Sequence, residues 1–342
     1  MRRPPAVARV LEKVTATARE HDMLRAGDNV LAACSGGPDS VCLLYSLCFL
    51  RRLFKVRLAV FHFDHRLRGD SAMDAEYVRR LAERLRIPFH LGVAGSKPRK
   101  GESVEAWASV ARARAATEVQ KEIDAGIIAE GHTLDDQAET VLLNLIRGGG
   151  LDAITGIWPS IGDRPYLRTV QPLIDVEREE VEAFCRALHL RPRRDPTNLE
   201  TRYMRNALRL KGIPELERAT GRAIKRPIAR SADLLRADRE ELFLQAAHAR
   251  DEIVHGRWSW RDMTFDAGAL RSLPRPIASR ALRFAIYQVA ADEWTAPWTK
   301  DAIDAVLDLA AGRSGRRRDL PNGLKAVREK GYVHLTRPSP GD

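Results

Sequence analysis

The sequence predicts an α/β fold: a doubly wound, mainly parallel sheet with a smaller, mainly helical and basic C-terminal domain. Short apolar runs alternate with helical patterns along residues 29–147, the order typical of a parallel sheet with right-handed crossovers. Basic residues are unevenly distributed. Residues 201–342 hold 27 basic and 18 acidic side chains, a net charge of +9, whereas residues 1–200 carry only +2.

The elements of the first domain follow from apolar periodicity. Strands are expected at 29–34, 56–63, 88–93 and 127–130, and helices at 39–50, 71–86, 104–123 and 134–147. Runs of four to eight apolar residues are typical of buried strands, and apolar residues three and four apart are typical of helices. Ligands of such sheets bind at the carboxyl ends of the strands.

A boundary follows this pattern. Residues 191–196 contain two prolines, which bias the preceding residues to extended geometry. Helical spacing resumes over 201–210, is expected to break at Gly212 and Pro214, and returns over 223–250. Residues 320–335 are expected to form short strands around an Asn-Gly turn. A length of 342 residues suits about two domains, which we predict at 1–210 and 211–342.

Composition excludes several classes of protein. An apolar fraction of 44% and a charged fraction of 30% exclude a collagen-like chain and argue against disorder. No uncharged apolar run reaches membrane-spanning length, and no signal peptide is recognised at the N-terminus. We therefore expect a cytoplasmic protein without membrane contact. The four cysteines form no CxxC pair and are expected to be reduced, with most of them buried; they are Cys34, Cys42, Cys48 and Cys185.

A glycine-rich loop follows the first predicted strand. It consists of Ser35, Gly36, Gly37, Pro38, Asp39 and Ser40. Glycines let the backbone approach a ligand closely, and the helix that follows offers free N–H groups and the positive end of its dipole. With the hydroxyl groups of Ser35 and Ser40, these features predict a phosphate site in which Asp39 holds Mg²⁺. The simpler interpretation is a Gly-Gly turn with polar helix caps.

A histidine and three carboxylates follow the fourth predicted strand, in GHTLDDQAET. His132, Asp136 and Glu139 are spaced four and then three residues apart. If the helix begins near Thr133, Asp136 and Glu139 share one face. Thr133 and Asp136 also fit a capping pair, a structural explanation for part of the pattern. Two such loops at one sheet edge would suit a nucleotide and Mg²⁺.

SGGPDS resembles the PP-loop of the N-type ATP pyrophosphatases, and GHTLDDQAETVLLNLIRGGG resembles the signature of the tRNA(Ile)-lysidine synthetases. Further segments resemble the same family in the same order, over residues 29–210. They lie at 62–68, 105–112, 172–180, 195–198 and 205–209. The tail LPNGL resembles the family's C-terminal module. The sequence departs from the family pattern at Arg66, Ala115, Ala116 and Gln171.

The resemblance implies a PP-loop, Rossmann-like fold and a two-step ligation that consumes ATP in the presence of Mg²⁺. ATP would adenylate the C2 carbonyl oxygen of the wobble cytidine in tRNA(Ile) with anticodon CAU. The ε-amine of free L-lysine would then attack C2 and expel AMP, which leaves lysidine. Residues 35–40 would bind ATP, and Asp39 and Asp136 would hold Mg²⁺.

The remaining expected roles concern the lysine and the phosphates. His132 is a candidate base, because imidazole titrates near neutral pH. Glu139 and Arg112 are the expected substrate-binding residues, and Asp136 is an alternative partner for the ammonium group. Arg205 would stabilise phosphate charge or contact the tRNA backbone, with an interdomain salt bridge as an equal alternative. The expected catalytic residues are thus Asp39, His132, Asp136 and Arg205.

The basic domain would bind tRNA, because Lys and Arg side chains pair with phosphates. Two clusters carry the charge: Arg222, Lys225, Arg226 and Arg230, then Arg313, Arg316, Arg317 and Arg318. A solvated arginine surface is the alternative interpretation. The sequence leaves the oligomeric state open, with a homodimer as one assembly.

Three other functions remain as alternatives. A tRNA thiolase usually needs paired cysteines, which this chain lacks, and an amidotransferase-type ligase needs a glutaminase half that is not present. A non-catalytic, nucleotide-sensing tRNA-binding module would release neither AMP nor pyrophosphate. The intact loop and carboxylate cluster argue against that module.

Overall fold

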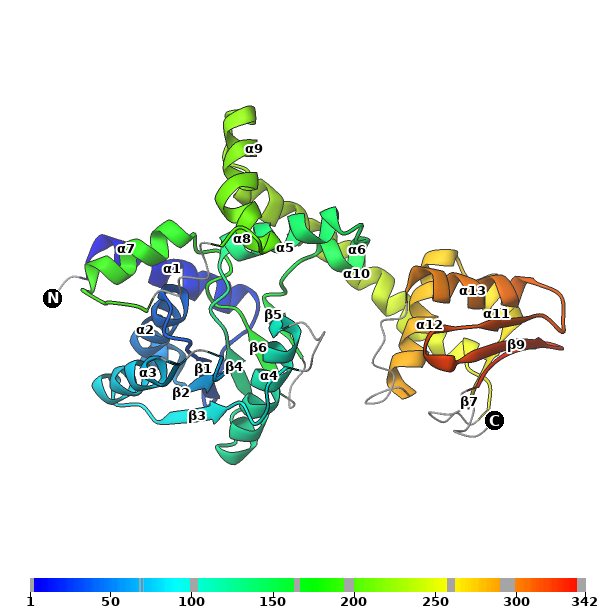
Figure 1. Cartoon of the computed structure of the whole chain (residues 1–342), viewed down its shortest axis with the longest axis horizontal. Helices are drawn as coiled ribbons and strands as arrows, with labels where there is room; N and C mark the ends of the chain where they lie inside the picture. Colours follow the sequence, from blue (N-terminus) through cyan, green and yellow to red (C-terminus); the bar gives the residue numbers. More distant parts are fainter. Residues whose placement is uncertain are drawn as a thin grey trace. The chain divides into compact units, whose positions relative to one another are not determined.

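The computed structural model describes residues 3–67, 69, 71–98, 104–162, 167–193, 200–256, 262–289 and 299–336. The chain divides into two compact units, Met1–Asp233 and Leu234–Asp342, and Figure 1 labels most of their helices and strands. This division lies C-terminal to the boundary predicted at residue 210. Within the described ranges, no helix is both long and apolar enough to cross a membrane.

The first unit is built on a six-stranded sheet with the order β3-β2-β1-β4-β6-β5. All neighbouring strands are parallel except β5, which runs antiparallel to β6. The strands are β1 (Asn29–Ala33), β2 (Arg57–Asp64), β3 (Phe89–Val93), β4 (Ile127–Ala129), β5 (Ser160–Ile161) and β6 (Arg168–Val170). The chain order reverses between β1 and β4, so the topological switch point lies between these two neighbours. The predicted mainly parallel sheet is confirmed.

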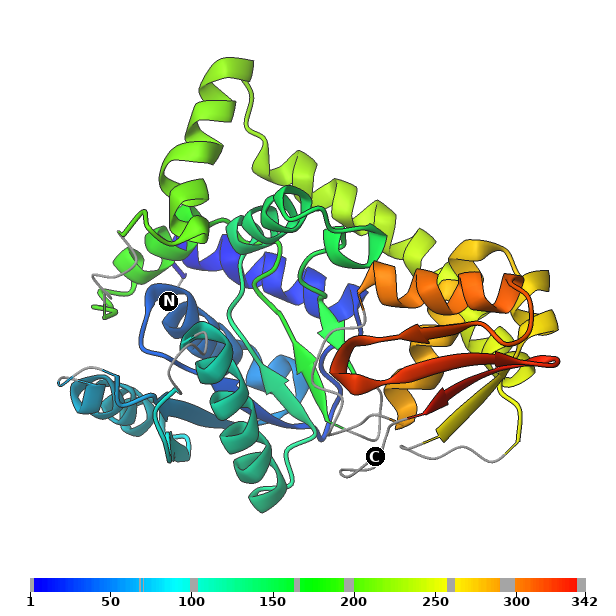
Figure 2. The ribbon, with the colours of Figure 1, turned by 45° about the vertical axis from the view of Figure 1, so that its right-hand side comes forward.

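Alternating side chains along each central strand enter two different cores. Val30 and Ala32 of β1 pack into the larger core, whereas Leu31 packs into the smaller one. The larger core is covered by α1 (Pro5–Glu20), α2 (Pro38–Phe54), α3 (Ser71–Leu85) and α7 (Arg178–Ala187), and the smaller one by α4 (Val104–Glu122). Figure 2 shows this sheet from a second direction. A strand buried on both faces reads as a continuous apolar run, which is why periodicity located these strands.

Most predicted helices of the first unit are confirmed within a few residues. They are α2 (Pro38–Phe54), α3 (Ser71–Leu85), α4 (Val104–Glu122) and α5 (Leu134–Ile146). The structure adds α1 (Pro5–Glu20), α6 (Leu151–Ile154) and α7 (Arg178–Ala187). Three of the four free cysteines are buried, and Cys48 is half-buried, as expected. The family-like segment 195–198 lies outside the described residues. Arg193 beside it donates its backbone N–H to the Gly36 carbonyl oxygen at 2.9 Å.

The predicted helix break at Gly212 and Pro214 is wrong. The chain passes from α8 (Met204–Ala207) through the π-helical turn η2 (Leu208–Gly212) into α9 (Ile213–Thr220). Gly212 has helical dihedral angles, and Pro214 lies in the first turn of α9. The Ile213 N–H still bonds the Leu208 carbonyl oxygen. The π-helical turn that precedes Pro214 accommodates a ring that regular α-helical spacing would exclude. The predicted long helix is confirmed as α10 (Lys225–Ile253).

The second unit encloses its own core between helices and an antiparallel sheet. The strand order is β7-β10-β9-β8. The elements are β7 (Asp262–Asp266), α11 (Ala267–Ser272), α12 (Arg275–Val289), α13 (Lys300–Ala311), β8 (Arg317–Asp319), η3 (Pro321–Gly323), β9 (Lys325–Glu329) and β10 (Tyr332–Thr336). The Asn-Gly turn lies between β8 and β9, as predicted, but β7 was not expected from the sequence.

Candidate active site

The loop after β1 forms a cradle at the N-terminus of α2. Gly36 adopts a φ of +92°, and a Cβ there would lie 3.3 Å from Tyr77 Cδ1, so both backbone geometry and space favour glycine. The Ser40 hydroxyl accepts from the Gly36 N–H at 3.2 Å and donates to the Gly37 carbonyl at 3.0 Å. No side chain caps α2. The loop is thus shaped by its own hydrogen bonds, and the helix end stays available to an anion.

Asp39 stands in the first turn of α2 with one engaged and one free oxygen. Its Oδ2 accepts from Arg178 Nη2 at 3.4 Å. Its Oδ1 is buried and has no hydrogen-bond partner among the described residues. Burial raises the pKa of Asp39 to about 6, although the charge of Arg178 opposes that rise. A buried carboxylate oxygen without a donor is a suitable ligand for a cation.

The loop after β4 ends in a complete capping box. Thr133 is the N-cap of α5, and its N–H and hydroxyl donate to Asp136 Oδ2 at 2.9 and 2.8 Å. Burial would raise the pKa of Asp136, but hydrogen bonds from Thr133 and the charges of His132 and Arg209 together lower it. The predicted capping pair is confirmed, and it fixes the Asp136 carboxylate at the start of α5.

Asp136 and Glu139 share one cation, Arg209. Glu139 has a relative exposure of 1% and accepts from Arg209 Nε at 2.6 Å and from Nη2 at 2.8 Å. The same Nη2 lies 3.2 Å from Asp136 Oδ1. Burial raises the pKa of Glu139 in spite of this bidentate pairing. The expected face of α5 is therefore a buried anionic site that already holds a guanidinium group.

His132 lies beside this site, at the ends of two neighbouring strands. Its Nδ1 is 2.9 Å from Gln171 Oε1 and 3.8 Å from Glu130 Oε2. Gln171 Nε2 donates to the same Glu130 oxygen at 3.0 Å. The imidazole orientation is thus set by groups that follow β4 and β6.

The two loops touch through Gly131. A Cβ at this position would lie 3.1 Å from the Asp39 carbonyl oxygen and 3.3 Å from the Ser40 nitrogen. The close approach of two backbones accounts for glycine here. It brings residues 35–40 and the cluster of His132, Asp136 and Glu139 together at the switch point, as the sequence predicted.

A second chain of charges runs from Asp39 to the start of α10. Arg178 contacts Asp39 with its guanidinium group and donates its backbone N–H to Asp135 Oδ2 at 2.8 Å. The other Asp135 oxygen accepts from Lys225 Nζ at 2.6 Å. Lys225 and Arg226, which were expected to bind tRNA, are thus paired within the first unit, the latter with Glu177 at 2.7 Å.

Two expected site residues, Arg205 and Arg112, are not among the residues that form hydrogen bonds within the carboxylate cluster. Arg205 donates to Thr140 Oγ1 at 2.7 Å, and its Nε lies 3.8 Å from Glu139 Oε2. Its side chain is 37% exposed, although its Nε is buried and has no hydrogen-bond partner among the described residues. Arg112 is exposed on α4. Within the described part of the chain, no hydrogen bond or ion pair joins Arg112 to Asp136 or Glu139.

Sequence reasoning did not assign roles to Arg209, Arg178, Gln171 and Glu130. The spacing of Arg205 and Arg209, four residues apart in a helical pattern, could have indicated that both face one partner. Arg178 gave no such signal, because its partner Asp39 is 139 residues away. Gln171 was noticed only as a departure from the family pattern.

The donors of this site fit Mg²⁺ bound together with a nucleotide. Among the described residues no group of three His, Cys, Asp or Glu side chains is arranged to hold a metal ion by itself. Mg²⁺ usually takes one or two carboxylates and fills its remaining positions with phosphates and water. The free, buried Oδ1 of Asp39 meets that requirement.

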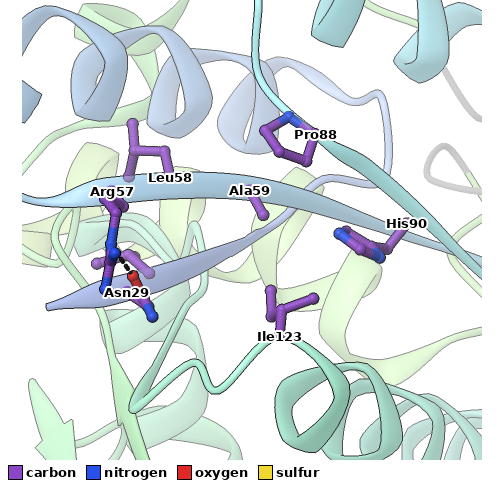
Figure 3. A pocket seen from close by; sticks show the side chains of 8 residues that line it. Asn29, Arg57, Leu58, Ala59, Pro88, His90 and Ile123 are labelled. Carbon is purple, nitrogen blue, oxygen red and sulfur yellow. Dashed lines mark hydrogen bonds between the residues drawn. The ribbon is translucent and has the colours of Figure 1, made fainter.

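A separate cavity of about 150 Å³ lies at the opposite edge of the sheet (Figure 3). Asn29 and Arg57, at the amino ends of β1 and β2, line it together with Pro88 and His90. Arg57 Nε donates to Asn29 Oδ1 at 2.5 Å. None of the residues that line this cavity belongs to the predicted site.

Comparison with known proteins agrees with these features. Residues 7–216 match the family model of a PP-loop domain. A tRNA(Ile)-lysidine synthase from Symbiobacterium thermophilum is 34% identical over 352 residues, covering 97% of this chain and 70% of that protein. The corresponding synthase from Thermobifida fusca is 33% identical over 335 residues, covering 92% of this chain and 96% of that one.

Among solved structures, the U34-tRNA thiolase NcsA from Methanococcus maripaludis matches with a TM-score of 0.58 and 20% identity. The match covers 68% of this chain and 79% of that one. At this identity the likeness shows the fold alone. The family model and the relatives show more: the chain belongs to the tRNA(Ile)-lysidine synthase family, ligases built on an ATP-using PP-loop domain.

Proposed function

We propose that this ligase joins free L-lysine to C2 of the wobble cytidine of a tRNA(Ile) with anticodon CAU. In the first step, the C2 carbonyl oxygen attacks the α-phosphorus of ATP and pyrophosphate leaves. In the second, the lysine ε-amine loses a proton and attacks C2, and the C2–O bond breaks to release AMP. The observation that carries the proposal is the contact at Gly131, which joins a phosphate cradle to a buried cation site.

The cradle suits the first step. The N-terminus of α2 has no side-chain cap, so its N–H groups and the Ser35 hydroxyl would bind the leaving pyrophosphate. The Ser40 hydroxyl, which bonds Gly36 and Gly37, would hold the loop in shape for the phosphates. Asp39 and Asp136 would hold Mg²⁺, which supplies charge neutralisation for the phosphates when bound. Arg205, whose side chain is 37% exposed, is suited to an additional contact with phosphate oxygens.

The carboxylate site suits the second step. Glu139 already binds a cation in bidentate fashion through Arg209, and a carboxylate has about four lone-pair positions. An incoming ammonium group would therefore find an acceptor on Glu139, with Asp136 as the alternative acceptor if Asp39 alone holds Mg²⁺. His132, at the edge of the same site, is the proposed base that takes the proton from the ε-ammonium group. Arg112 is the proposed partner of the lysine α-carboxylate, because it is an exposed cation on α4.

The second unit is the proposed tRNA-binding part. Arg313 and the stretch Arg316–Arg318 are exposed, and β8 forms one edge of its sheet. Their charges are suited to phosphate contacts, which give salt-dependent affinity and little sequence information. Replacing Arg316, Arg317 and Arg318 together by Gln should weaken tRNA binding and flatten its salt dependence. An unchanged slope of log Kd against log salt would remove this cluster from the interface.

Incorporation of radiolabelled lysine tests the reaction directly. Bulk tRNA, ATP and Mg²⁺ are incubated with the protein, and an elongator tRNA(Met) transcript with the same anticodon serves as control substrate. The proposal expects acid-precipitable label that resists mild alkaline deacylation, found in tRNA(Ile) and not in the control. Release of AMP without label would retain the ATP chemistry and refute lysine as the nucleophile. Release of neither would favour a binding module.

A further inference from the structure

Three polar side chains form a short hydrogen-bonded chain beside the carboxylate site. Glu130 follows β4, Gln171 follows β6, and His132 lies two residues beyond Glu130. The Gln171 side-chain amide stands between the other two, 3.0 Å from Glu130 Oε2 and 2.9 Å from His132 Nδ1. Gln171 has a relative exposure of 3%, so water does not replace these partners freely.

The donors and acceptors of this chain can be arranged in only one way while Glu130 is ionised. A carboxylate only accepts hydrogen bonds, so the NH₂ group of Gln171 must face Glu130. The amide oxygen of Gln171 then faces His132, and an amide oxygen also only accepts. His132 Nδ1 must therefore carry a proton. In a neutral imidazole the lone pair is then on Nε2.

The sheet itself holds these groups in place. Ala129 pairs with Val170 in the parallel register of β4 and β6, and the Glu130 N–H donates to the Val170 carbonyl oxygen at 2.9 Å. The Gln171 N–H donates to the Pro159 carbonyl oxygen at 2.8 Å. Because the backbone anchors both partners, the amide is held between Glu130 and His132 by the fold.

We infer that Glu130 and Gln171 are positioning residues that hold His132 in its Nδ1–H form, so that Nε2 is the atom that accepts the proton from lysine. The second half of this inference rests on the proposed function, and the first half does not. Free histidine prefers the opposite tautomer, with the proton on Nε2. The chain therefore has a measurable consequence: it reverses the intrinsic preference of the imidazole.

Nitrogen NMR of the full-length protein reads the tautomer directly. Ring nitrogens of ¹⁵N-histidine-labelled protein are observed at a pH at which imidazole is neutral, and the His132→Asn variant assigns the His132 signals. The inference expects a protonated Nδ1 and an unprotonated Nε2 in the wild-type protein. An unprotonated Nδ1 there would overturn it.

Three variants separate positioning from mere packing. Gln171→Met keeps much of the side-chain volume but removes the acceptor, so the tautomer should shift toward Nε2–H. Gln171→Glu places a second carboxyl group against Glu130, and the two would share one proton. The other oxygen of the introduced carboxyl group still faces His132 as an acceptor, so Nδ1–H should be retained. Glu130→Gln, at a half-buried side chain, frees the Gln171 amide to reverse and should give a mixture. If the tautomer were the same in Gln171→Met and Glu130→Gln as in the wild type, the chain would not set it.

Steady-state kinetics of the Gln171 variants test whether the Nδ1–H tautomer of His132 is needed for lysidine formation. Gln171→Met should lower kcat for lysidine formation about tenfold or more, since general bases contribute about 10²–10⁴-fold. KM for ATP and tRNA should stay within about twofold, and Gln171→Glu should recover most of kcat. A shifted tautomer with unchanged kcat would refute Nε2 as the proton acceptor. A wild-type protein that ligates no lysine would refute the proposed function, while the NMR result would still decide the hydrogen-bonded chain.

Discussion

The two helices that meet at the site, α2 and α5, begin in opposite ways. Helix α2 follows Gly37 and Pro38 and has no side-chain cap, whereas α5 begins at Thr133 with both halves of a capping box. At α2 the aspartate of the first turn keeps a free oxygen, and at α5 Asp136 is hydrogen-bonded through both. The N-terminus of α2 therefore has N–H groups that can bind a ligand, whereas the capping box at the N-terminus of α5 fixes the position of the Asp136 carboxylate.

The largest effect is expected from removing the charge at the open end. Asp39→Asn should lower ATP-dependent AMP release by about 10³-fold or more, because it removes the carboxylate proposed for Mg²⁺. Circular dichroism should show an intact fold, and tRNA binding should be nearly unchanged. Glu83→Gln, an exposed carboxylate on α3, is the matched control. AMP release by Asp39→Asn at the wild-type rate would show that Asp39 is not a required Mg²⁺ ligand.

The same substitution should have the opposite effect on stability in the absence of Mg²⁺. Burial raises the pKa of Asp39 from 3.8 in the unfolded chain to about 6 in the fold. The folded state then binds the proton more tightly, so stability is lost as the pH rises from about 4 to above 6. A shift of about two pKa units corresponds to about 3 kcal/mol.

Urea unfolding in EDTA measures this effect. At pH 7.5 Asp39→Asn should be more stable than the wild type by about 3 kcal/mol, and at pH 5 by about half of that. If the stability of Asp39→Asn relative to the wild type increased toward low pH, the ionised form of Asp39 would be stabilised by its charged partners more than it is destabilised by burial. Asp136→Asn should instead lose stability at pH 7.5, since the pKa of Asp136 is lowered in the fold.

A cap added to α2 would make the two helix ends alike. Gly37 has extended dihedral angles, and a Cβ there meets only Ser35 Oγ at 3.5 Å, an ordinary contact. Gly37→Asp should occupy the free N–H groups and repel phosphates, and we expect KM for ATP to rise about tenfold or more. Gly37→Ala controls for the added Cβ and should change KM far less. Equal KM values in the two variants would mean that the helix end does not bind the phosphates.

The smallest effect is expected from removing the cap of α5. Thr133→Ala removes the hydroxyl half of the capping box, leaves the backbone N–H bond to Asp136, and should lower the free energy of unfolding by about 1 kcal/mol. Thr117→Ala on α4, where the hydroxyl only bonds the carbonyl of Ala113, should change it by a few tenths. Comparison of their urea midpoints checks this. Similar losses in both variants would mean that the cap contributes nothing special to α5.

Local sequence patterns predicted the structural features that are determined by residues close together in the chain. The buried run 29–34 became β1, and Thr133 and Asp136 became the capping pair, because strand burial and helix caps are decided within a few residues. The two loops met because parallel strands bring their carboxyl ends to one edge. The four parallel strands β1 to β4 and the position of the site at their carboxyl ends could therefore be predicted from the sequence, whereas β5 and β6 could not.

Contacts between distant segments were not accessible in this way. Arg209 lies 70 residues from Glu139, and Gln171 lies 39 residues from His132, and no local rule pairs them. The continuous helical backbone through Gly212 and Pro214 was not predicted, because it depends on a π-helical turn. This turn accommodates a proline that the spacing of a regular α-helix would exclude. Strand β7 was missed because its partner β10 lies at the far end of the second unit.

The internal hydrogen bonds of the loop after β1 have a thermodynamic consequence. The Ser40 hydroxyl joins Gly36 to Gly37 when the chain folds, so the backbone of the loop loses its conformational entropy at that stage. A ligand that arrives later does not have to order it again. The phosphates of ATP would therefore bind a preorganised loop. The binding free energy from hydrogen bonds to the loop is then reduced only slightly by the entropic cost of ordering its backbone.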